Sequence, residues 1–566
     1  MIFDLGRQCP QPLEIAMKSL ALLLLASWGG ALNAQPLAQD RQNPDRSPLH
    51  RAHKTGDHGA ETAQFPDEMR TIDGQLNNLR HSWWGAAEQP MLRLVAADYA
   101  DGLGTPAGGN RPSARAISNV VVAQTGSILN RGGASDMVWQ WGQFLDHDLT
   151  ETPIADPAEA FDILVPLGDT WFDPFQTGSM VIPLDRSGYE LDGGVRQQLN
   201  LITAFVDASN VYGSDEARAL ELRTLDGTGR LRTSAGELLP YNVNGFANAP
   251  TNEAHYFLAG DIRANEQIGL TALHTLFVRE HNHWADALAA RGLRDGDTIY
   301  QYARAIVAAE MQAITYREFL PALLGEDALR EYRGYRPDVD PRIANEFATA
   351  AYRFGHTMLS PQLRRVMADG STHPLGDLSL ASAFFAPQEV EATGIAPILR
   401  GLCAQQAQEI DAQLIDEVRN FLFGPPGAGG FDLAALNIQR GRDHGLPSYV
   451  RLRQELGAGR VRNFGEITRD ADRRDRLMQA YGRVERIDAW VGLLSEDHAP
   501  GALVGPTLRR ILIDQFTRLR DGDRFWYQSY LPPELVAMVE RQTLARIIRR
   551  NSGVGAELPA DVWHVR

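Results

Sequence analysis

The sequence contains very few cysteines and lysines. Cysteine occurs only at positions 9 and 403 of the 566 residues, which excludes a disulfide framework and a metal site made of thiolates alone. Lysine occurs only at positions 18 and 54, so arginine carries nearly all of the positive charge. The arginine side chain stays charged, and its planar group suits carboxylate partners. Because two cysteines cannot supply a full set of thiolate ligands, any redox cofactor must be held by other ligands.

Basic residues are also outnumbered by acidic ones. The chain has 55 Lys and Arg against 71 Asp and Glu, which gives a formal net charge of −16. Nucleic-acid binding requires a basic surface, so we expect no nucleic-acid partner. With 44% hydrophobic and 22% charged residues, the composition is that of a folded globular protein. The length allows either several domains or one large domain.

Long apolar runs are scarce, and a short one lies near the N-terminus. Met17 and Lys18 precede the apolar run 20–26, and small residues follow as far as Ala34. This order predicts a secretory signal peptide over residues 1–34, cleaved after Ala34. The alternative is a transmembrane anchor, which needs about 20 apolar residues, more than this run provides. We expect a secreted or periplasmic protein without stable membrane insertion.

The segment 35–76 is polar and contains many Pro, Asp, Arg and His residues without periodic apolar spacing, which predicts a flexible linker. After cleavage of the signal peptide, Cys403 would be the one remaining cysteine. A large exported chain without disulfides favours a bacterial envelope, or the medium around the cell, as its location.

From residue 77 onward, helical periodicity dominates. Apolar residues three and four apart, such as Leu270, Leu273 and Leu276, predict one helix. Similar spacing occurs over residues 303–319, 342–359, 409–423, 446–456, 505–519 and 533–549. Strand-like alternation is short and rare, and no internal repeat has a fixed period. The prediction is a mainly α fold, with a single large domain over residues 77–566 and few short strands.

The densest group of polar and aromatic residues is the stretch 139–148. If it is helical, with Ser135 as its N-cap, Gln143, Asp146 and His147 share one face. The aromatic neighbours in the same stretch predict burial, which makes polar groups without partners costly. Asp148 is turned by about 100° from His147 and must have another role. The alternative is an ordinary histidine flanked by solvated acids.

Two further stretches each place polar groups at one location. Arg263 and Glu266 are three residues apart, so their side chains can meet at one site or form a surface ion pair. In the stretch 203–209 every second residue offers an oxygen, an arrangement that suits Ca²⁺ if the loop is extended. These oxygens belong to the side chains of Thr203, Asp207 and Ser209 and to the carbonyl of Phe205. An ordinary polar loop is the alternative.

Two histidine-containing stretches complete the set. One is 352–357, which contains His356, and the other is 436–445, which contains His444. A histidine among apolar helical residues is more often a core residue than a ligand, so neither stretch is decisive alone.

Together these motifs resemble the peroxidase-cyclooxygenase superfamily, the haem peroxidases typified by myeloperoxidase, lactoperoxidase and peroxidasin. The resemblance runs in the family's order over residues 77–566. It implies a mainly helical haem-peroxidase domain around a buried haem b, with bound Ca²⁺. It also implies an enzyme that reduces H₂O₂ and, through a ferryl intermediate, oxidises halides, thiocyanate or small phenolic donors.

The resemblance implies a role for each residue around the haem. His147 matches the distal base, Gln143 its polar neighbour near the small-anion site, and Arg263 the distal arginine. Asp146 and Glu266 match the two carboxylates that form ester bonds with haem methyl groups.

On the other side of the haem, the resemblance implies that His356 binds the iron. Asn437 would accept a hydrogen bond from the other ring nitrogen of His356, and Arg353 and Arg440 would lie near the haem propionates. The Ca²⁺ site would consist of Asp148, Thr203, Phe205, Asp207 and Ser209.

Two departures from the family pattern bear on activity. Gln267 stands where some members have a methionine that forms a third haem bond, so we expect bromide, iodide, thiocyanate or phenols as donors rather than chloride. Arg353 stands three residues before His356, where cyclooxygenases have a radical tyrosine, and Tyr352 is one place too early. This disfavours the first alternative, a fatty-acid dioxygenase. The second alternative is a non-catalytic Ca²⁺-binding or adhesion protein, which would not need His147 and Arg263.

Overall fold

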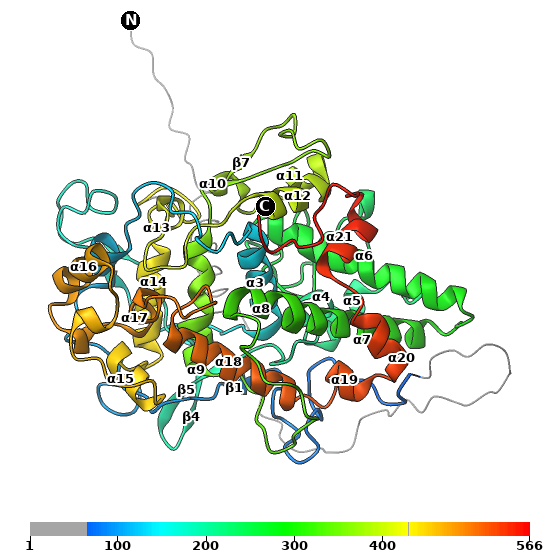
Figure 1. The fold of residues 1–566 in the computed structure, drawn as a ribbon, viewed down its shortest axis with the longest axis horizontal. Helices are drawn as coiled ribbons and strands as arrows, with labels where there is room; N and C mark the ends of the chain where they lie inside the picture. Colours follow the sequence, from blue (N-terminus) through cyan, green and yellow to red (C-terminus); the bar gives the residue numbers. More distant parts are fainter. Residues whose placement is uncertain (1–64, 428, 566) are drawn as a thin grey trace, which may run out of the picture.

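The computed structural model describes residues 65–427 and 429–565. Helices make up most of its regular structure (Figure 1), which confirms the prediction of a mainly α fold. The predicted signal peptide, residues 1–34, and residues 35–64 of the predicted linker lie outside the described residues.

Four helical segments carry most of the residues discussed below: α3 (Asp136–Leu149), α6 (Ile268–Ala290), η4 (Ala351–Met358) and α14 (Leu433–Asp443). The remaining helices are α2 (Ala114–Ile117), η1 (Ser118–Val122), α4 (Ser209–Tyr212), α5 (Glu216–Leu222), η2 (Ala235–Glu237), α7 (Gly296–Ile314), η3 (Thr315–Phe319), α8 (Leu320–Leu324), α9 (Asn345–Thr349), α10 (Leu380–Ala383), α11 (Pro387–Thr393), α12 (Ala396–Ala404), α13 (Asp416–Arg419), α15 (Tyr449–Glu455), η5 (Phe464–Glu466), α16 (Ala471–Tyr481), η6 (Val484–Arg486), α17 (Ala489–Ser495), α18 (Pro506–Asp521), α19 (Tyr527–Tyr530), α20 (Pro533–Val539) and α21 (Leu544–Ser552).

The strands are short and antiparallel. The largest sheet has the order β1-β5-β4 and contains β1 (Gln89–Pro90), β4 (Tyr189–Asp192) and β5 (Val195–Asn200). Asp192 pairs with Val195, and the two glycines between them have φ values of 57° and 87°, which a two-residue hairpin turn requires. The two small sheets pair β2 (Ile163–Leu164) with β3 (Val181–Ile182), and β6 (Gln362–Leu363) with β7 (Leu378–Ser379).

Aromatic packing between α3 and α6 fixes the position of α3 in the core. The rings of Trp141 and Phe144 on α3 lie 5.7 and 5.2 Å from that of Phe277 on α6, and all three residues are fully buried. Each such side chain buries a large apolar area, and well-packed aromatic pairs add about 0.5–1.5 kcal/mol beyond it. The opposite face of α3 is therefore left to carry polar residues.

Three of the predicted helices differ from the structure. Most of 409–423 is not helical, because the backbone of Gln408, Glu409 and Leu414 hydrogen-bonds to distant segments instead. The stretch 342–359 is divided into α9 and η4, because Ala350 leaves helical geometry at φ −130° and ψ −60°. The stretch 533–549 is divided into α20 and α21, because Thr543 is extended and caps α21.

The packed domain includes residues 65–76, which were predicted to belong to the linker. The ring of Phe65 stacks on Tyr302 at 3.9 Å, and Arg70 Nη2 donates to both carboxylate oxygens of Asp523 at 2.8 and 2.9 Å. These two anchors lie in an otherwise polar stretch, so its composition does not reveal them. Within the described ranges, no helix combines the length and the apolar character needed to cross a membrane.

Candidate active site

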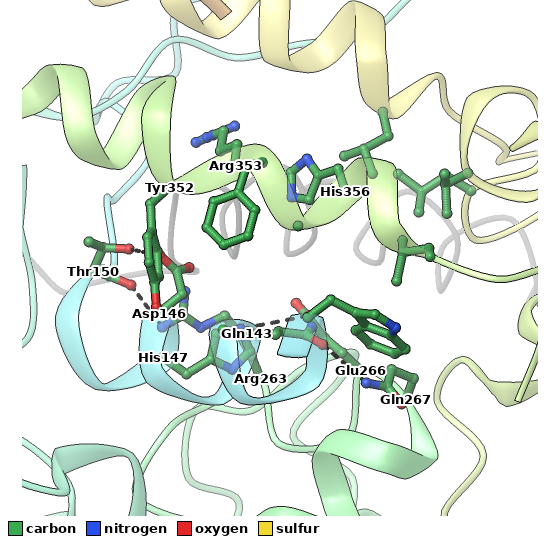
Figure 2. Close-up of a pocket in the computed structure, with 18 of the residues that line it drawn as sticks. Gln143, Asp146, His147, Thr150, Arg263, Glu266, Gln267, Tyr352, Arg353 and His356 are labelled. Atoms are coloured by element: carbon green, nitrogen blue, oxygen red, sulfur yellow. Dashed lines mark hydrogen bonds and ion pairs between the residues drawn. The ribbon is translucent and has the colours of Figure 1, made fainter. Parts of the chain in front are cut away.

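A cavity lies between α3 and η4 (Figure 2). His147 on α3 and His356 on η4 lie on opposite walls, and both are buried. The structure therefore brings together two histidines that are more than 200 residues apart in the sequence.

Helix α3 presents three predicted site residues to the cavity. Gln143, Asp146 and His147 all line it, as the three- and four-residue spacing predicted. Ser135 occupies the N-cap position, but its hydroxyl does not cap the helix, because it donates to the carbonyl of Val562 at 2.6 Å. The packing of α3 against α6, rather than a side-chain cap, therefore holds these residues in place.

An ion pair with Asp261 holds Arg263 beside His147. Arg263 Nε and Nη2 donate to the two carboxylate oxygens of Asp261 at 2.9 and 2.7 Å, and both side chains are buried. Asp261 Oδ1 also lies 3.3 Å from His147 Nδ1. Asp261 lies two residues before Arg263, and the sequence analysis gave it no role. The sequence signal that could have identified Asp261 is an acidic residue two positions before Arg263.

Close backbone packing positions Asp261. A Cβ atom on Gly260 would lie 2.4 Å from the carbonyl oxygen of Ser209, so only glycine fits there. The Asp261 N–H donates to the carbonyl of Asn210 at 3.0 Å, and the Asn210 amide donates to the Phe144 carbonyl on α3 at 2.7 Å. This chain of contacts fixes Asp261 relative to α3.

Burial keeps His147 neutral. Desolvation and the neighbouring Arg263 charge lower the pKa of His147 well below its usual 6.5, although the Asp261 charge opposes this shift. Burial opposes the charge on Arg263, but the charge and hydrogen bond of Asp261, together with the charges of Glu151 and Asp146, raise the pKa of Arg263 above its ordinary value. At neutral pH the site therefore pairs a neutral imidazole, which can accept a proton, with a permanent cation.

Side-chain amides connect the second predicted ester carboxylate to α3. Gln143 Nε2 donates to Glu266 Oε2 at 2.9 Å, and Gln267 Nε2 donates to Gln143 Oε1 at 3.0 Å and to Gln140 Oε1 at 2.6 Å. Gln267 also caps α6, because its Oε1 accepts from the Gly269 N–H at 2.6 Å. Gln267 thus acts within an amide network on the cavity wall.

The other predicted ester carboxylate, Asp146, is half-buried and accepts a hydrogen bond on one oxygen. Thr150 Oγ1 donates to Asp146 Oδ1 at 2.8 Å, and the Thr150 carbonyl accepts from Arg263 Nη2 at 2.9 Å. Burial raises the pKa of Asp146, although the Arg263 charge opposes this rise. Asp146 and Glu266 both line the cavity.

The amide of Asn437 on α14 contacts His356, but in an orientation that differs from the prediction. Asn437 Nδ2 lies 2.7 Å from His356 Nδ1, and Asn437 Oδ1 accepts from Arg353 Nη1 at 2.9 Å. The amide nitrogen, rather than the oxygen, therefore faces the ring. The reason is Arg353, which needs an acceptor and takes the oxygen.

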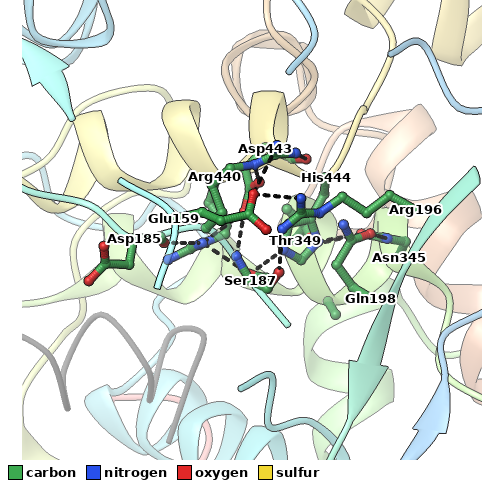
Figure 3. Close-up of polar contacts among 12 residues, drawn as sticks. Glu159, Asp185, Ser187, Arg196, Gln198, Asn345, Thr349, Arg440, Asp443 and His444 are labelled. Carbon is green, nitrogen blue, oxygen red and sulfur yellow. Dashed lines mark hydrogen bonds and ion pairs between the residues drawn. The ribbon is translucent and has the colours of Figure 1, made fainter. Parts of the chain in front are cut away.

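Arg440 lies behind the cavity, in a buried polar network (Figure 3). Its Nη1 donates to Asp443 Oδ2 at 2.9 Å, to the Asp185 carbonyl at 2.8 Å and to Ser187 Oγ at 3.0 Å. His444 Nε2 lies 2.7 Å from the same Ser187 hydroxyl. Arg353 lines the cavity, whereas Arg440 does not.

Hydrogen bonds join four of the five predicted calcium ligands, Asp148, Thr203, Asp207 and Ser209. Ser209 Oγ donates to Asp148 Oδ1 at 2.8 Å, Thr203 Oγ1 donates to Asp207 Oδ1 at 3.0 Å, and the Asp207 N–H donates to Asp148 Oδ2 at 3.1 Å. The loop is bent rather than extended, with Ala208 at φ 65°. This bend, rather than a strand-like period of two, brings the oxygens together.

Two carboxylates are buried side by side in this cluster. Asp207 Oδ2 is buried without a hydrogen bond. Burial and the charge of Asp207 raise the pKa of Asp148 to about 8. In residues 65–427 and 429–565, no group of three or more His, Cys, Asp or Glu side chains is placed to hold a metal ion. A cation here would therefore need hydroxyl or carbonyl oxygens in addition to the two carboxylates, which is a donor set that suits Ca²⁺.

An aromatic cluster forms another part of the cavity wall. Phe423 lies 4.9 Å from Phe384 and 5.5 Å from Phe385 between ring centroids, and Leu380 and Leu422 line the cavity beside them. Phe385 and Phe423 have φ values of 50° and 65°, a region that costs bulky residues free energy. The sequence analysis did not identify this cluster.

Together, the cavity and its two histidines suit a haem cofactor. The cavity has an imidazole on each wall, apolar side chains between them and carboxylates at its edge, and this donor set fits haem. The chain belongs to the animal haem peroxidase family, whose model matches residues 69–563.

Several relatives are similar over most of this chain. Human eosinophil peroxidase is 39% identical over 86% of this chain and 75% of its own length. Peroxinectin A of Dictyostelium discoideum is 36% identical over 87% of this chain and 95% of its own length. A peroxidasin homologue of Caenorhabditis elegans is 37% identical over 89% of this chain, which spans 43% of that relative.

Solved structures also share the fold. Peroxidase A from Dictyostelium discoideum matches with a TM-score of 0.81 and 33% identity, over 88% of this chain and all of that one. The fatty acid alpha-dioxygenase of Oryza sativa matches with a TM-score of 0.74 over 88% of this chain and 87% of that one. Its sequence identity is 21%, so this second match concerns the fold alone.

Proposed function

We propose that this protein is an exported haem peroxidase that reduces H₂O₂ and oxidises bromide, iodide, thiocyanate or small phenols. The observation that carries this proposal is the meeting of His147, Arg263 and His356 at one buried cavity. Family membership supports a haem cofactor and peroxide chemistry in general.

The distal residues would handle the proton of the peroxide. Neutral His147 would take a proton from one peroxide oxygen and return it to the other, which leaves as water. Arg263, held by Asp261, would stabilise the negative charge that develops on the leaving oxygen. Such acid–base catalysis contributes about 10²- to 10⁴-fold, and each electrostatic donor about 10²- to 10³-fold.

The proximal residues would hold and adjust the cofactor. Haem, when bound, supplies the redox chemistry, and His356 would bind its iron through Nε2. Nδ1 must then carry the proton, so Asn437 would have to turn its amide by 180° and present Oδ1 to the ring. Arg353 Nη1, which now donates to that oxygen, would be released toward a haem propionate. Arg440, which does not line the cavity, would hold the neighbouring buried network through Ser187 and Asp443.

Asp146 and Glu266 would hold the haem through ester bonds to its methyl groups. Each ester would replace a methyl C–H bond by a C–O bond, a two-electron oxidation in which H₂O₂, the proposed substrate, is reduced to water. Both carboxylates line the cavity, Glu266 buried and Asp146 half-buried, and this position would allow such bonds to form. Gln143 would lie beside Glu266, near the site of the small anion.

Two features support the proposed donors. Gln267 occupies the position at which a methionine would form a third haem bond, which argues against the oxidising power that chloride requires. The part of the cavity wall formed by Phe384 and Phe423 suits aromatic donors, which can stack on such rings. Steady-state rates with H₂O₂ and a panel of halides, thiocyanate and phenols test this proposal. Activity toward chloride equal to that toward bromide would contradict it.

A Ca²⁺ ion would neutralise the two buried carboxylates next to the distal helix. Asp148, Thr203, Asp207 and Ser209 would bind it with side-chain oxygens, and Phe205 with its carbonyl. Because Asp148 directly follows His147, the ion would also fix the end of α3.

A fatty-acid dioxygenase remains the second candidate, because its fold is shared and Tyr352 has a buried hydroxyl at the cavity. Arg353, rather than a tyrosine, precedes His356 by three residues. Oxygen uptake with a polyunsaturated fatty acid, without peroxide, would favour this candidate over a peroxidase.

For export, residues 1–34 would be the cleaved signal peptide. N-terminal sequencing of the protein recovered outside the cytoplasm should begin at Gln35. A protein that still carries residues 1–34 would contradict this part of the proposal.

A further inference from the structure

Glu151 lies between the haem pocket and a broad groove on the outside of the protein. Its side chain lines both the cavity that contains His147 and the groove that contains Arg218 and Ile262. Only 7% of Glu151 is exposed to solvent. The groove meets the cavity on the distal side, because Gly260 and Ile262, which line the groove, flank Asp261.

The backbone around Glu151 is fixed. Its N–H donates to Asn200 Oδ1 at 2.8 Å, and its carbonyl accepts from the Leu201 N–H at 2.7 Å. The carbonyl of the preceding residue, Thr150, accepts from Arg263 Nη2 at 2.9 Å. The carboxyl group of Glu151 therefore extends from a rigid point next to the distal arginine.

The charged groups that face Glu151 leave it able to exchange a proton near neutral pH. These groups are Arg263 and Asp261, from the loop before α6, and Arg218 from α5. Burial and the Asp261 charge outweigh the two arginines and raise the pKa of Glu151 to about 7. A carboxyl group in this condition can both take up and release protons at the pH of most media.

Oxidation of an anion consumes a proton that the distal histidine cannot provide. One halide ion, one H₂O₂ and one proton yield one hypohalous acid and one water. The halide loses two electrons, and the O–O bond breaks as it accepts them. His147 is neutral at rest and only moves a proton from one peroxide oxygen to the other, so the additional proton must come from elsewhere. A phenol, by contrast, releases its own proton when it is oxidised.

We propose that Glu151 is a proton-relay residue that takes a proton from water in the groove and delivers it to the distal side of the cavity when an anion is oxidised. The proposal rests on the peroxidase function proposed above. It predicts a division between donors: turnover of anions depends on Glu151, and turnover of phenols does not.

The first test compares wild type with Glu151→Gln and Glu151→Asp in the haem-loaded protein, with iodide or bromide and with a phenol, across pH. For Glu151→Gln we expect halide turnover at pH 7 to fall roughly tenfold or more, with little change for the phenol. The Asp variant should retain part of the halide rate with a shifted pH profile. Glu190→Gln is the matched control, because Glu190 lines the same groove but not the cavity.

An unchanged halide rate and pH profile in Glu151→Gln would overturn the relay. An equal loss for halide and phenol would also overturn it, because that result indicates a structural defect. If wild type binds haem but oxidises no donor, the peroxidase function itself fails, so the two failures can be distinguished.

A second test measures whether a reagent dissolved in the groove reaches position 151, and it does not rely on catalytic turnover. In Glu151→Cys, the introduced thiol should react with a small charged thiol reagent in the holoprotein, as peptide mass spectrometry would show. The buried Cys403 serves as the internal control and should remain unmodified. If the thiol at position 151 stays unmodified while the protein is folded, the groove does not reach this position and the relay is wrong.

Discussion

Asp261→Asn tests how the distal side is held together. Asp261 accepts two hydrogen bonds from buried Arg263 and lies 3.3 Å from His147 Nδ1. Asparagine keeps the shape but removes the charge, so the buried Arg263 cation loses its ion pair with Asp261. Loss of one partner of a buried ion pair costs about 3–5 kcal/mol. We expect a loss of stability of about this size, measured by denaturant unfolding.

The same substitution should slow the reaction with peroxide. Arg263 would no longer be fixed, and the loss of one preorganised electrostatic group costs about 10²- to 10³-fold in rate. Stopped-flow mixing of the haem-loaded variant with H₂O₂ measures this directly. The acid limb of the rate should also move to lower pH, because the Asp261 charge raises the pKa of His147 and its removal lowers that pKa further.

The pH dependence of the free energy of unfolding tests the direction of the Asp261 pKa shift. The folded-state pKa of Asp261 is depressed, chiefly by Arg263, so its stabilisation is complete above the unfolded pKa of about 3.9 and is lost only as pH falls through the folded pKa. The titration of Asp261 itself should therefore leave the stability difference between wild type and Asp261→Asn unchanged from about pH 5 to pH 8. A change within this range would come from Glu151, because the Asp261 charge helps to raise the pKa of Glu151.

Asp488→Asn is the matched control. Asp488 is also buried and accepts from Arg442 at 2.8 Å and from Arg111 at 2.7 Å, but it does not line the cavity. The Asp488→Asn variant should lose a comparable free energy of unfolding and should react with peroxide at the wild-type rate. Equal peroxide rates in wild type and Asp261→Asn would refute the reasoning.

Three further predictions concern the cofactors. His356→Ala should lose haem, whereas His147→Ala should keep it and react with H₂O₂ about 10²- to 10⁴-fold more slowly, as absorption spectra and stopped-flow traces would show; equal behaviour of the two variants would contradict their roles. After treatment with peroxide, acidified organic solvent should not extract the haem of wild type but should extract that of the Asp146→Ala, Glu266→Ala double variant; complete extraction from wild type would refute the ester bonds. Asp207→Asn should weaken Ca²⁺ binding at least tenfold in calorimetry, because one of two carboxylate ligands is lost; unchanged affinity would place the ion elsewhere.

Local spacing predicted some parts of the site well. The three- and four-residue spacing of Gln143, Asp146 and His147 specifies a shared helical face, because helical geometry depends on neighbouring residues alone. The mainly α fold followed from the same periodicity. The stretch 409–423 shows the limit of this reasoning, because its backbone bonds to segments distant in sequence override its helical pattern.

Residues whose role depends on tertiary contacts could not be assigned from spacing. Asp261 matters because it lies beside His147, and Glu151 because it separates two spaces that the folded chain creates. The orientation of Asn437 depends on a competing donor, Arg353, which lies 84 residues away in sequence. Phe65 and Arg70 anchor a polar stretch whose composition predicted a linker.

The central claim is that one haem lies between His147 and His356. Its most direct test is a crystal structure of the haem-loaded protein with the iron located from its anomalous signal. The account predicts a single iron in this cavity, bonded to His356 Nε2, with space for peroxide on the side of His147. Iron bonded to another residue, or a haem outside the cavity, would contradict it.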